Sequence, residues 1–448
     1  MSNARCNPLV APLFFYLKTF STANYFLNSF TSLKYFYQGI GQVKGEKIMQ
    51  TAIAYLQQCL QIPSVNPMDG EEAVARYVYD VLVDHQISTE WIEVSPKRIC
   101  LVATVPASED VSRPAVLGLS GHLDTVPVQG DGWTKDPYGG EIENGRIYGR
   151  GASDMKSGVM AMVQALIQYR ERQDRPNTIK LLITSDEENG MTGARHLTEQ
   201  GHADDLDALL ITEPTSGMIG YAQKGVVGIE VTCRGKSAHS SAPQLGRNAI
   251  DDVYRVIQEV KSERFSITAN HHPALGPVVA SITSIKGGEG PNVVPSQASF
   301  YMDIRTIPGF DRADVLAAFT AIERRLVAED SEFDMNVTVI KDIPSCETDE
   351  QAPFLQQVAD TMEQVSGVTP RKIAIPGGTD GAMFSQAKKS FPIAIASFHD
   401  FRLAHQVDES IPLSEYEKTI AFCFNLINTP LHQSLPSHKK KKGRHSIL

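Results

Sequence analysis

The sequence predicts an α/β protein whose first and last parts form one domain, with an α+β domain inserted between them. Four short apolar runs, at 115–119, 179–184, 208–212 and 393–397, are typical of strands that are covered on both faces. Helical segments lie beside these runs, and residues 225–341 follow a different order of strands and helices. The 448 residues are enough for two such domains.

The first domain begins with two predicted helices. The helix at 51–61 stops before Pro63, and the helix at 71–85 places Val74, Val78 and Val81 on one side. The strand at 115–119 comes next, followed by a helix at 156–172 and the strands at 179–184 and 208–212. The fourth strand, at 393–397, returns to this domain after the insertion.

The inserted segment has the order strand, helix, strand, strand, helix, strand. The strands are predicted at 226–233, 278–285, 298–304 and 335–340, and the helices at 247–261 and 312–328. This order is that of a ferredoxin-like unit. We therefore expect a first domain in two parts, 49–224 and 342–430, and an inserted domain at 225–341.

Both ends of the chain differ from the body. Residues 1–48 are rich in aromatic side chains and poor in acidic ones, and they contain a short apolar run that matches a secretion signal poorly. Our hypothesis is that Met49 is the natural start and that residues 1–48 are a mis-called extension or a disordered leader. The basic residues in 431–448 are interpreted as a disordered tail.

Composition restricts the class of protein. Hydrophobic residues make up 42% and charged residues 21%, which is typical of a globular protein, and no apolar run is long enough to span a bilayer. The net charge of the chain is −10, and since residues 1–48 carry +4 and residues 438–448 carry +5, the body between them carries −19. We therefore expect neither nucleic acid nor a membrane as a partner. The six cysteines are widely spaced, which predicts reduced thiols and a cytoplasmic location.

Histidines and carboxylates follow the four predicted strands of the first domain. His122 follows the first of them, Glu187 and Glu188 the second, Glu213 the third, and His405 lies beyond the fourth. Open α/β sheets bind ligands outside the carboxyl ends of their strands. Imidazole nitrogen and carboxylate oxygen are the ligands expected of a catalytic zinc ion. The sequence therefore predicts a metal site at this edge.

Six motifs occur in order along the chain: Gly-His-Leu-Asp-Thr-Val-Pro at 121–127, Gly-Arg-Gly-Ala-Ser-Asp-Met-Lys-Ser-Gly at 149–158, Asp-Glu-Glu at 186–188, Thr-Glu-Pro at 212–214, Gly-Lys-Ser-Ala-His-Ser-Ser at 235–241, and Ala-His at 404–405. By these motifs the chain resembles a family of zinc-dependent deacylases and exopeptidases that contains acetylornithine deacetylase, succinyl-diaminopimelate desuccinylase, aminoacylase and carboxypeptidase G. The resemblance covers about residues 50–430. It implies a metallopeptidase-type catalytic domain with a mixed central sheet, and an inserted lid and dimerisation domain.

The resemblance also implies a metal-ligand set. His122 and Glu213 would hold one ion, Glu188 and His405 the other, and Asp154 would bridge the two. The implied cofactors are two divalent ions, Zn²⁺ or Co²⁺. A pair of ions about 3.5–4 Å apart can hold both the attacking water and the carbonyl oxygen of the substrate.

Three further residues would take part in the reaction by this resemblance. Asp124 would orient the ring of His122. Glu187 would act as general acid and base, since adjacent carboxylates point in different directions and Glu188 would bind metal. His239 would reach the active site of a partner subunit and stabilise the oxyanion, which implies a homodimer built through the inserted domain.

Four residues match family positions that contact the substrate. Asn292 and Arg305 would bind a substrate carboxylate, for which the planar guanidinium is well suited. Gly378 and Thr379 lie in a glycine-rich loop that would touch the substrate backbone.

These expectations together describe a metal-dependent hydrolase of the N-acyl amide bond of an acylated amino acid. The pattern most resembles enzymes that convert N-succinyl-diaminopimelate to diaminopimelate and succinate, a reaction of lysine biosynthesis. An acetylornithine deacetylase, a broad aminoacylase and a dipeptidase remain as alternatives, and a non-catalytic binding protein is a more distant one. The sequence leaves open the acyl group, the metal and the number of ions needed.

Overall fold

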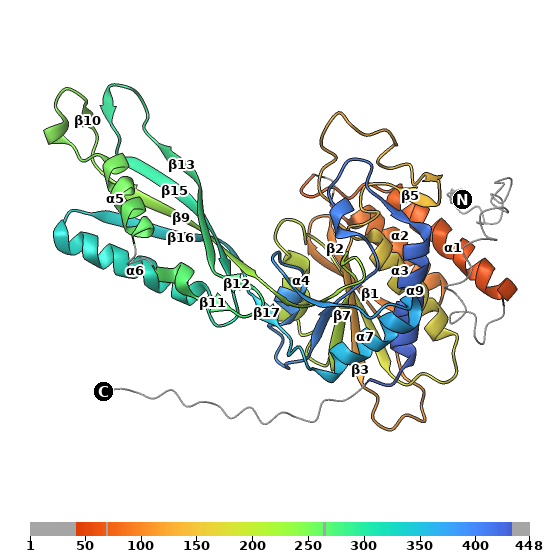
Figure 1. Ribbon diagram of the computed structural model, residues 1–448. Coiled ribbons are helices and arrows are strands. Elements are labelled where there is room, and N and C mark those ends of the chain that lie inside the picture. The colour runs from red at the N-terminus through yellow and green to blue at the C-terminus, as the bar shows by residue number, and fades with distance from the viewer. Residues whose placement is uncertain (1–41, 69, 263–265, 432–448) are drawn as a thin grey trace, which may run out of the picture.

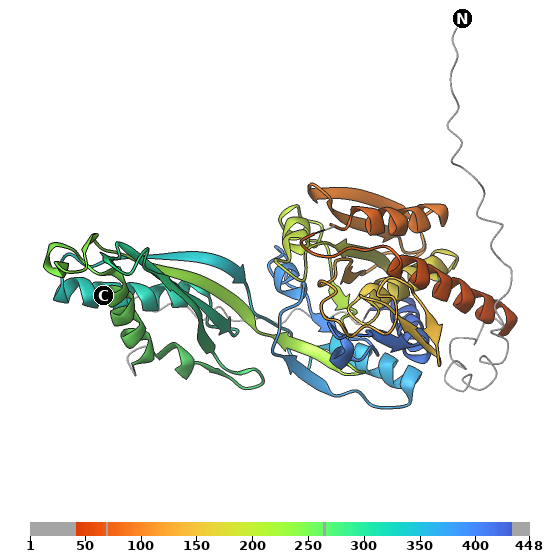
Figure 2. The ribbon, with the colours of Figure 1, turned by 90° about the horizontal axis from the view of Figure 1, so that it is seen from above.

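The computed structural model describes residues 42–68, 70–262 and 266–431. Figures 1 and 2 show two lobes, a rounded one built on a central sheet and an elongated one joined to it by extended strands. The predictions made for residues 1–41 and 432–448 concern segments outside this description. No helix among the described residues is long and apolar enough to cross a membrane.

The rounded lobe contains a mixed sheet of nine strands. Its four middle strands, in the order β6, β3, β7 and β19, are parallel, and the neighbouring strands on both sides are antiparallel to them. The carboxyl ends of the four parallel strands therefore share one edge. The path of the sheet is β1 (Ser88–Ser95), β2 (Arg98–Val105), β6 (Thr178–Thr184), β3 (Val116–His122), β7 (Ala208–Ile211), β19 (Ile393–Ile395), β8 (Ile219–Gln223) and β17 (Cys346–Glu347), and β18 (Lys372–Ile375) also pairs with β8.

Helices cover both faces of this sheet (Figure 1). One face shares an apolar core with α1 (Gln42–Leu60), α2 (Glu72–Asp84), α3 (Lys156–Arg170), α7 (Pro353–Ser366) and α9 (Leu413–Asn428). The other face packs against α4 (Thr192–Glu199) and α8 (Gly381–Phe384). Helix α3 is buried from Lys156 to Tyr169, because α1 and α9 cover the side that does not face the sheet. A small separate sheet contains β4 (Ile142–Glu143), β5 (Arg146–Tyr148) and β20 (Ser410–Pro412).

The elongated lobe has the predicted ferredoxin-like order. Its elements are β9 (Gly225–Arg234), α5 (Ala249–Lys261), β13 (Val279–Gly287), β15 (Gln297–Thr306), α6 (Arg312–Glu329) and β16 (Asp334–Ile343). The strands form an antiparallel sheet in the order β13, β15, β9, β16, and the two helices pack into a single apolar core with it. Two short pairs of strands accompany it. Strand β10 (Ala238–His239) pairs with the sequence-distant β14 (Val293–Val294), and β11 (His271–His272) forms a hairpin with β12 (Gly276–Pro277).

Two boundaries differ from the sequence prediction. Helix α1 begins at Gln42, so it crosses the predicted domain start at Met49. Strand β16 continues to Ile343, two residues past the predicted end of the insertion, because it stays paired with β9 as far as Val226. That Met49 is the natural start of the protein stays a prediction.

The chain passes between the two lobes twice, and the two connecting segments lie side by side at Gly225. A Cβ atom at this position would lie 2.5 Å from both the carbonyl oxygen of Ile343 and the amide nitrogen of Ser345. Contacts between the lobes surround this junction: His272 Nε2 lies 3.1 Å from Glu347 Oε1, and Arg195 donates to the Asp342 carbonyl at 2.7 Å. The junction is therefore packed too closely for a side chain.

The substitution Gly225→Ala is expected to lower the free energy of unfolding by about 1–3 kcal/mol, because backbone atoms must move to admit the methyl group. Urea denaturation measures this change. Gly290→Ala is the matched control, since its nearest neighbour would lie 3.7 Å away. Equal unfolding midpoints for the two variants would contradict the packing described at the junction.

Candidate metal centre

The edge of the sheet brings together residues that are distant in the sequence. His122 is the last residue of β3, Glu188 follows β6 after three intervening residues, and Asp154 lies in the loop before α3. One possible ligand atom from each of these three residues lies within 4.8 Å of the others. The predicted position of a metal site, beyond the carboxyl ends of the parallel strands, is therefore the place where these groups meet.

Asp154 lies between the two histidines. Its Oδ1 is 3.2 Å from His122 Nε2, and its Oδ2 is 3.4 Å from His405 Nε2. On one side Glu213 Oε1 lies 3.6 Å from His122 Nε2, and on the other Glu188 Oε1 lies 3.1 Å from His405 Nε2. The site therefore divides into two halves, each with one imidazole and one carboxylate, and Asp154 is common to both.

The tautomer of His122 suits a cation. Its Nδ1 lies 3.0 Å from the backbone carbonyl oxygen of Asp124, which can only accept a hydrogen bond, so Nδ1 carries the proton. In the neutral ring Nε2 then presents its lone pair toward Asp154 and Glu213. A lone pair that faces two carboxylates fits a metal ion between them.

Asp124 also accepts backbone hydrogen bonds that the sequence did not indicate. Its two carboxylate oxygens accept hydrogen bonds from the backbone N–H groups of Glu187, at 3.0 Å, and Glu188, at 3.1 Å. Burial alone would raise the pKa of Asp124, but hydrogen bonds from His122, Asn66 and the Glu187 backbone lower it below its usual range. One buried carboxylate therefore orients the imidazole and fixes the turn that carries both glutamates.

A network of polar side chains holds Asp124 in place through hydrogen bonds. Asn66 donates to Asp124 at 2.9 Å and to Asp186 at 2.8 Å, and it accepts from Arg98 at 2.8 Å. Arg98 also pairs with Glu71, which accepts from the Asp186 backbone. Asn66, Arg98 and Glu71 did not stand out in the sequence, because no motif links positions so far apart.

Glu409 holds the loop that carries Asp154. Its two carboxylate oxygens accept from the backbone N–H groups of Ser153 at 2.8 Å, Asp154 at 3.0 Å and Gly151 at 3.2 Å. Arg150 completes the set with a contact of 2.6 Å, and both side chains are buried. Glu409 lies beyond His405 in the chain, so it also joins this loop to the segment that follows β19.

Negative charge accumulates at the centre. Burial raises the pKa of Glu187 and Glu213 well above the usual range, and neighbouring carboxylates add to the effect. Burial also raises the pKa of Asp380 to about 7. Hydrogen bonds with Asp154 and Glu188 raise the pKa of His405 to about 10. Divalent cations would relieve this repulsion, and the donor set of nitrogen and oxygen atoms fits Zn²⁺ or a similar ion.

His239 and Asn292 lie far from this centre. His239 is the last residue of β10, which lies at the outer end of the elongated lobe in Figure 1, and Asn292 directly precedes β14, the strand that pairs with β10. The Asn292 carbonyl accepts from the Ser240 backbone at 3.0 Å, so the structure places the two residues beside each other. It does not bring either one to the metal centre of its own chain.

The other three residues expected to contact the substrate are Arg305, Gly378 and Thr379, and they lie near the junction between the two lobes. Arg305, near the end of β15, pairs with Asp303 at 2.7 Å. Gly378 is near Met191 and the backbone of Lys224, and Thr379 is hydrogen-bonded to Gln223. This places the glycine-rich loop next to the crossing between the lobes.

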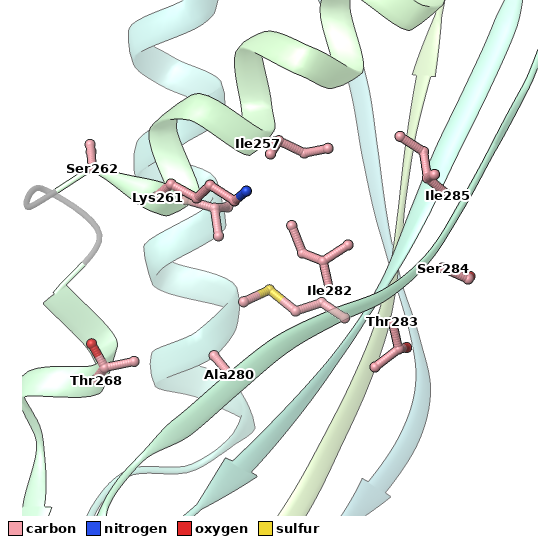
Figure 3. Close-up of a pocket in the computed structure, with 11 residues that line it drawn as sticks. Ile257, Lys261, Ser262, Thr268, Ala280, Ile282, Thr283, Ser284 and Ile285 are labelled. Carbon is pink, nitrogen blue, oxygen red and sulfur yellow. The ribbon is translucent and has the colours of Figure 1, made fainter.

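A cavity of about 580 Å³ lies elsewhere, within the elongated lobe. Figure 3 shows Ile257 of α5 and Ile282 of β13 facing each other across it. Its lining contains no residue of the metal centre.

Imidazoles and carboxylates grouped at the edge of an α/β sheet, with Asp154 between the two histidines, are an arrangement expected of a metal-dependent hydrolase. Residues 118–429 match the model of Peptidase family M20/M25/M40, and the chain belongs to this family. It is therefore a hydrolase.

Relatives with assigned names support this membership. The chain is 31% identical over 402 residues to a probable succinyl-diaminopimelate desuccinylase of Staphylococcus aureus, covering 81% of this chain and 92% of the relative. It is 32% identical over 397 residues to the protein of the same name from Staphylococcus epidermidis, covering 82% and 94%. An acetylornithine deacetylase of Vibrio atlanticus is 34% identical over 243 residues, covering 54% and 62%.

Solved structures show the same fold at low sequence identity. An aminopeptidase from Bacillus cereus has a TM-score of 0.67 at 20% identity, covering 85% of this chain and 98% of its own. A dinuclear metal-binding peptidase of the same family from Bacillus subtilis has a TM-score of 0.64 at 16% identity, covering 85% and 98%. These likenesses confirm the predicted catalytic fold.

Metal affinity is expected to rise with pH. The metal-free centre holds protons on His405, whose pKa is raised to about 10, and on carboxyls whose pKa is also raised. Each bound proton must leave before an ion can bind, so affinity grows about tenfold per pH unit for each proton displaced. Competition with a chelator between pH 6 and pH 8 measures this slope.

The same protons set the stability of the metal-free protein. A carboxyl whose pKa is raised by folding favours the fold below its unfolded pKa, and this contribution is lost as the pH rises through the folded pKa. The difference in thermal midpoint between metal-loaded and chelator-treated protein should therefore widen from pH 6 to pH 8. An affinity and a midpoint difference that do not change with pH would contradict the proton competition.

Proposed function

We propose that this protein removes the N-acyl group from an acylated amino acid, with N-succinyl-diaminopimelate as substrate and diaminopimelate and succinate as products. The observation that carries the proposal is the placement of Asp154, whose two oxygens face His122 and His405. The names of the relatives that cover most of the chain support the succinyl substrate. This reaction would place the protein in lysine biosynthesis.

Five residues would hold the metal. His122 and Glu213 would bind one ion, Glu188 and His405 the other, and Asp154 both, in agreement with the division of the site into two halves. The ions would be Zn²⁺ or Co²⁺. When bound, two such ions polarise the amide carbonyl and activate a water molecule.

Glu187 would move the proton. Its backbone is fixed by Asp124, and its carboxyl belongs to the same charged cluster as His122 and Glu213. Glu187 would take a proton from the attacking water and return it to the amine nitrogen as the C–N bond breaks. The raised pKa of Glu187 suits a group that must both accept and donate a proton.

The partner in our proposal is a second copy of this chain. His239 lies at the outer end of the inserted domain, so it could stabilise an oxyanion only in the active site of another subunit (Figure 1). Asn292 directly precedes the paired strand β14 and accepts a hydrogen bond from the Ser240 backbone, so it would arrive with His239. The inserted domain would thus serve as lid and dimerisation domain.

The substrate contacts complete the proposal. Arg305 would bind a carboxylate of the substrate, and Gly378 and Thr379 would contact its backbone. We also propose a cytoplasmic location, in keeping with the five described cysteines, which are all free thiols.

Acetylornithine deacetylation is the second candidate, because the Vibrio atlanticus relative matches part of this chain. An aminoacylase or a dipeptidase would use the same centre. A non-catalytic binding protein is disfavoured, since every residue expected to bind metal or move the proton is present and the chain belongs to a hydrolase family.

A panel of substrates tests the proposal. N-succinyl-diaminopimelate, N-acetylornithine, N-acetylmethionine and a simple dipeptide are compared by amine release in the presence of Zn²⁺ or Co²⁺. We expect kcat/KM for the succinyl substrate to exceed the others by about a hundredfold, which a few specific contacts can supply. A flat or acetyl-favouring profile would overturn the succinyl assignment.

Glu187→Gln is the matched control for this panel. It should lower kcat by about 10²–10⁴-fold on whichever substrate is cleaved, while the metal content stays unchanged. Substantial turnover by this variant would remove Glu187 from the mechanism.

Mixed dimers test the assignment of His239. His239→Ala and Glu187→Gln are each expected to be inactive as pure dimers. In a mixed dimer, the subunit with Ala at position 239 keeps Glu187 and receives an intact His239 from its partner, so one site is complete.

Half of the dimers are mixed after random exchange of subunits, so activity should return to about a quarter of the wild-type value. The rate of amine release after mixing measures this recovery. If activity stays absent after exchange has been verified, His239 does not act across subunits.

A further inference from the structure

The glycine-rich loop from Gly377 to Gly381 is held from one side by Gln223. The Gln223 amide donates to the Thr379 carbonyl at 3.0 Å, and the Thr379 hydroxyl donates to the Gln223 side-chain oxygen at 2.7 Å. Both side chains are buried. Gln223 is the last residue of β8, and the chain enters the inserted domain just beyond it, at Gly225. This pair therefore joins the loop to the crossing between the lobes.

The same loop is held from the other side by Asp380. The hydroxyl of Thr184 donates to the Asp380 carboxylate, and both side chains are at most 1% exposed. Thr184 is the last residue of β6, three residues before Glu187. The other oxygen of Asp380, Oδ1, has no hydrogen-bond partner among the described residues. Asp380 therefore depends on Thr184 for its side-chain contact.

We propose that Asp380 and Gln223 are positioning residues, which fix the glycine-rich loop between the end of β6, just before Glu187, and the end of β8, just before the chain enters the inserted domain. This inference rests on the proposed role of Glu187 and of the loop. Neither side chain is assigned a contact with metal or substrate. Each acts through a neighbour: Asp380 through Thr184 and the end of β6, and Gln223 through Thr379.

Loss of the Asp380 contact and loss of the Gln223 contact should change different kinetic constants. The Asp380 link sets where the end of β6, and with it Glu187, lies relative to the loop that would hold the substrate. Loss of this link should lower kcat, because a displacement of about 1 Å can cost on the order of a hundredfold in rate. The Gln223 link sets the place of Thr379 itself. Its loss should raise KM, because Thr379 would contact the bound substrate.

Thr184→Val removes the hydroxyl with little change of shape. On the substrate that wild type cleaves best, we expect kcat to fall about tenfold to a hundredfold and KM to stay within about threefold. Thr184→Ser keeps the hydroxyl and should restore most of kcat. Thr361→Val is the matched control, because this buried hydroxyl donates to a helix carbonyl in α7, and the variant should stay near the wild-type rate. Thr184→Ala is the second variant if Thr184→Val does not fold.

Gln223→Met tests the other link. We expect KM to rise about tenfold, with kcat within about threefold of wild type, since a buried carbonyl and a hydroxyl lose their partner. A kcat loss in Thr184→Ser equal to that in Thr184→Val would overturn the role of Asp380. The same changes of kcat and KM in Thr184→Val and Gln223→Met would show general loosening, and would also overturn the proposal.

Hydrogen–deuterium exchange of the metal-loaded protein provides a readout that needs no substrate. Thr184→Val should speed exchange in peptides that cover 185–190 and 377–381, and Thr361→Val should leave these peptides unchanged. Unchanged exchange in Thr184→Val would overturn the inference even if the enzyme is active. Failure of wild type to cleave any amide of the panel would overturn the proposed function alone, because the exchange result does not depend on turnover.

Discussion

The position of Asp154 is the constraint on which the rest of the site depends. One carboxylate can face two imidazoles only if the loop that carries it and the segments that carry His122 and His405 reach the same point. Parallel strands provide this, because β3, β6, β7 and β19 end at one edge of the sheet. Glu409 adds the local restraint, since it accepts hydrogen bonds from the backbone of the Asp154 loop.

Such a centre is electrostatically costly without cations. Several carboxylates are buried close together, and their pKa values rise because burial and mutual repulsion oppose ionisation. Asp124 stays ionised because His122, Asn66 and the backbone of the glutamate turn donate to it. The scaffold therefore fixes one negative charge by hydrogen bonds and leaves the others facing the place where metal ions would bind.

Periodicity and motifs were enough to predict the four parallel strands, the residues at their ends and the ferredoxin-like insertion. They did not indicate Glu409 or Asn66, because each acts through a contact with a distant segment and neither belongs to a recognisable local pattern. The hairpin of β1 and β2 was also missed; β1 lies at the edge of the sheet and contains no fully buried residue. No local signal placed the start of α1 at Gln42 instead of Met49, because helix ends depend on packing as well as composition.

The central proposal is that Asp154 would bridge two metal ions, and anomalous X-ray scattering from crystals grown with Zn²⁺ tests it most directly. The account predicts two peaks about 3.5–4 Å apart, one beside each oxygen of Asp154. One peak should lie next to His122 and the other next to His405. A single peak in fully loaded crystals, or a pair of peaks that does not flank Asp154, would contradict the account.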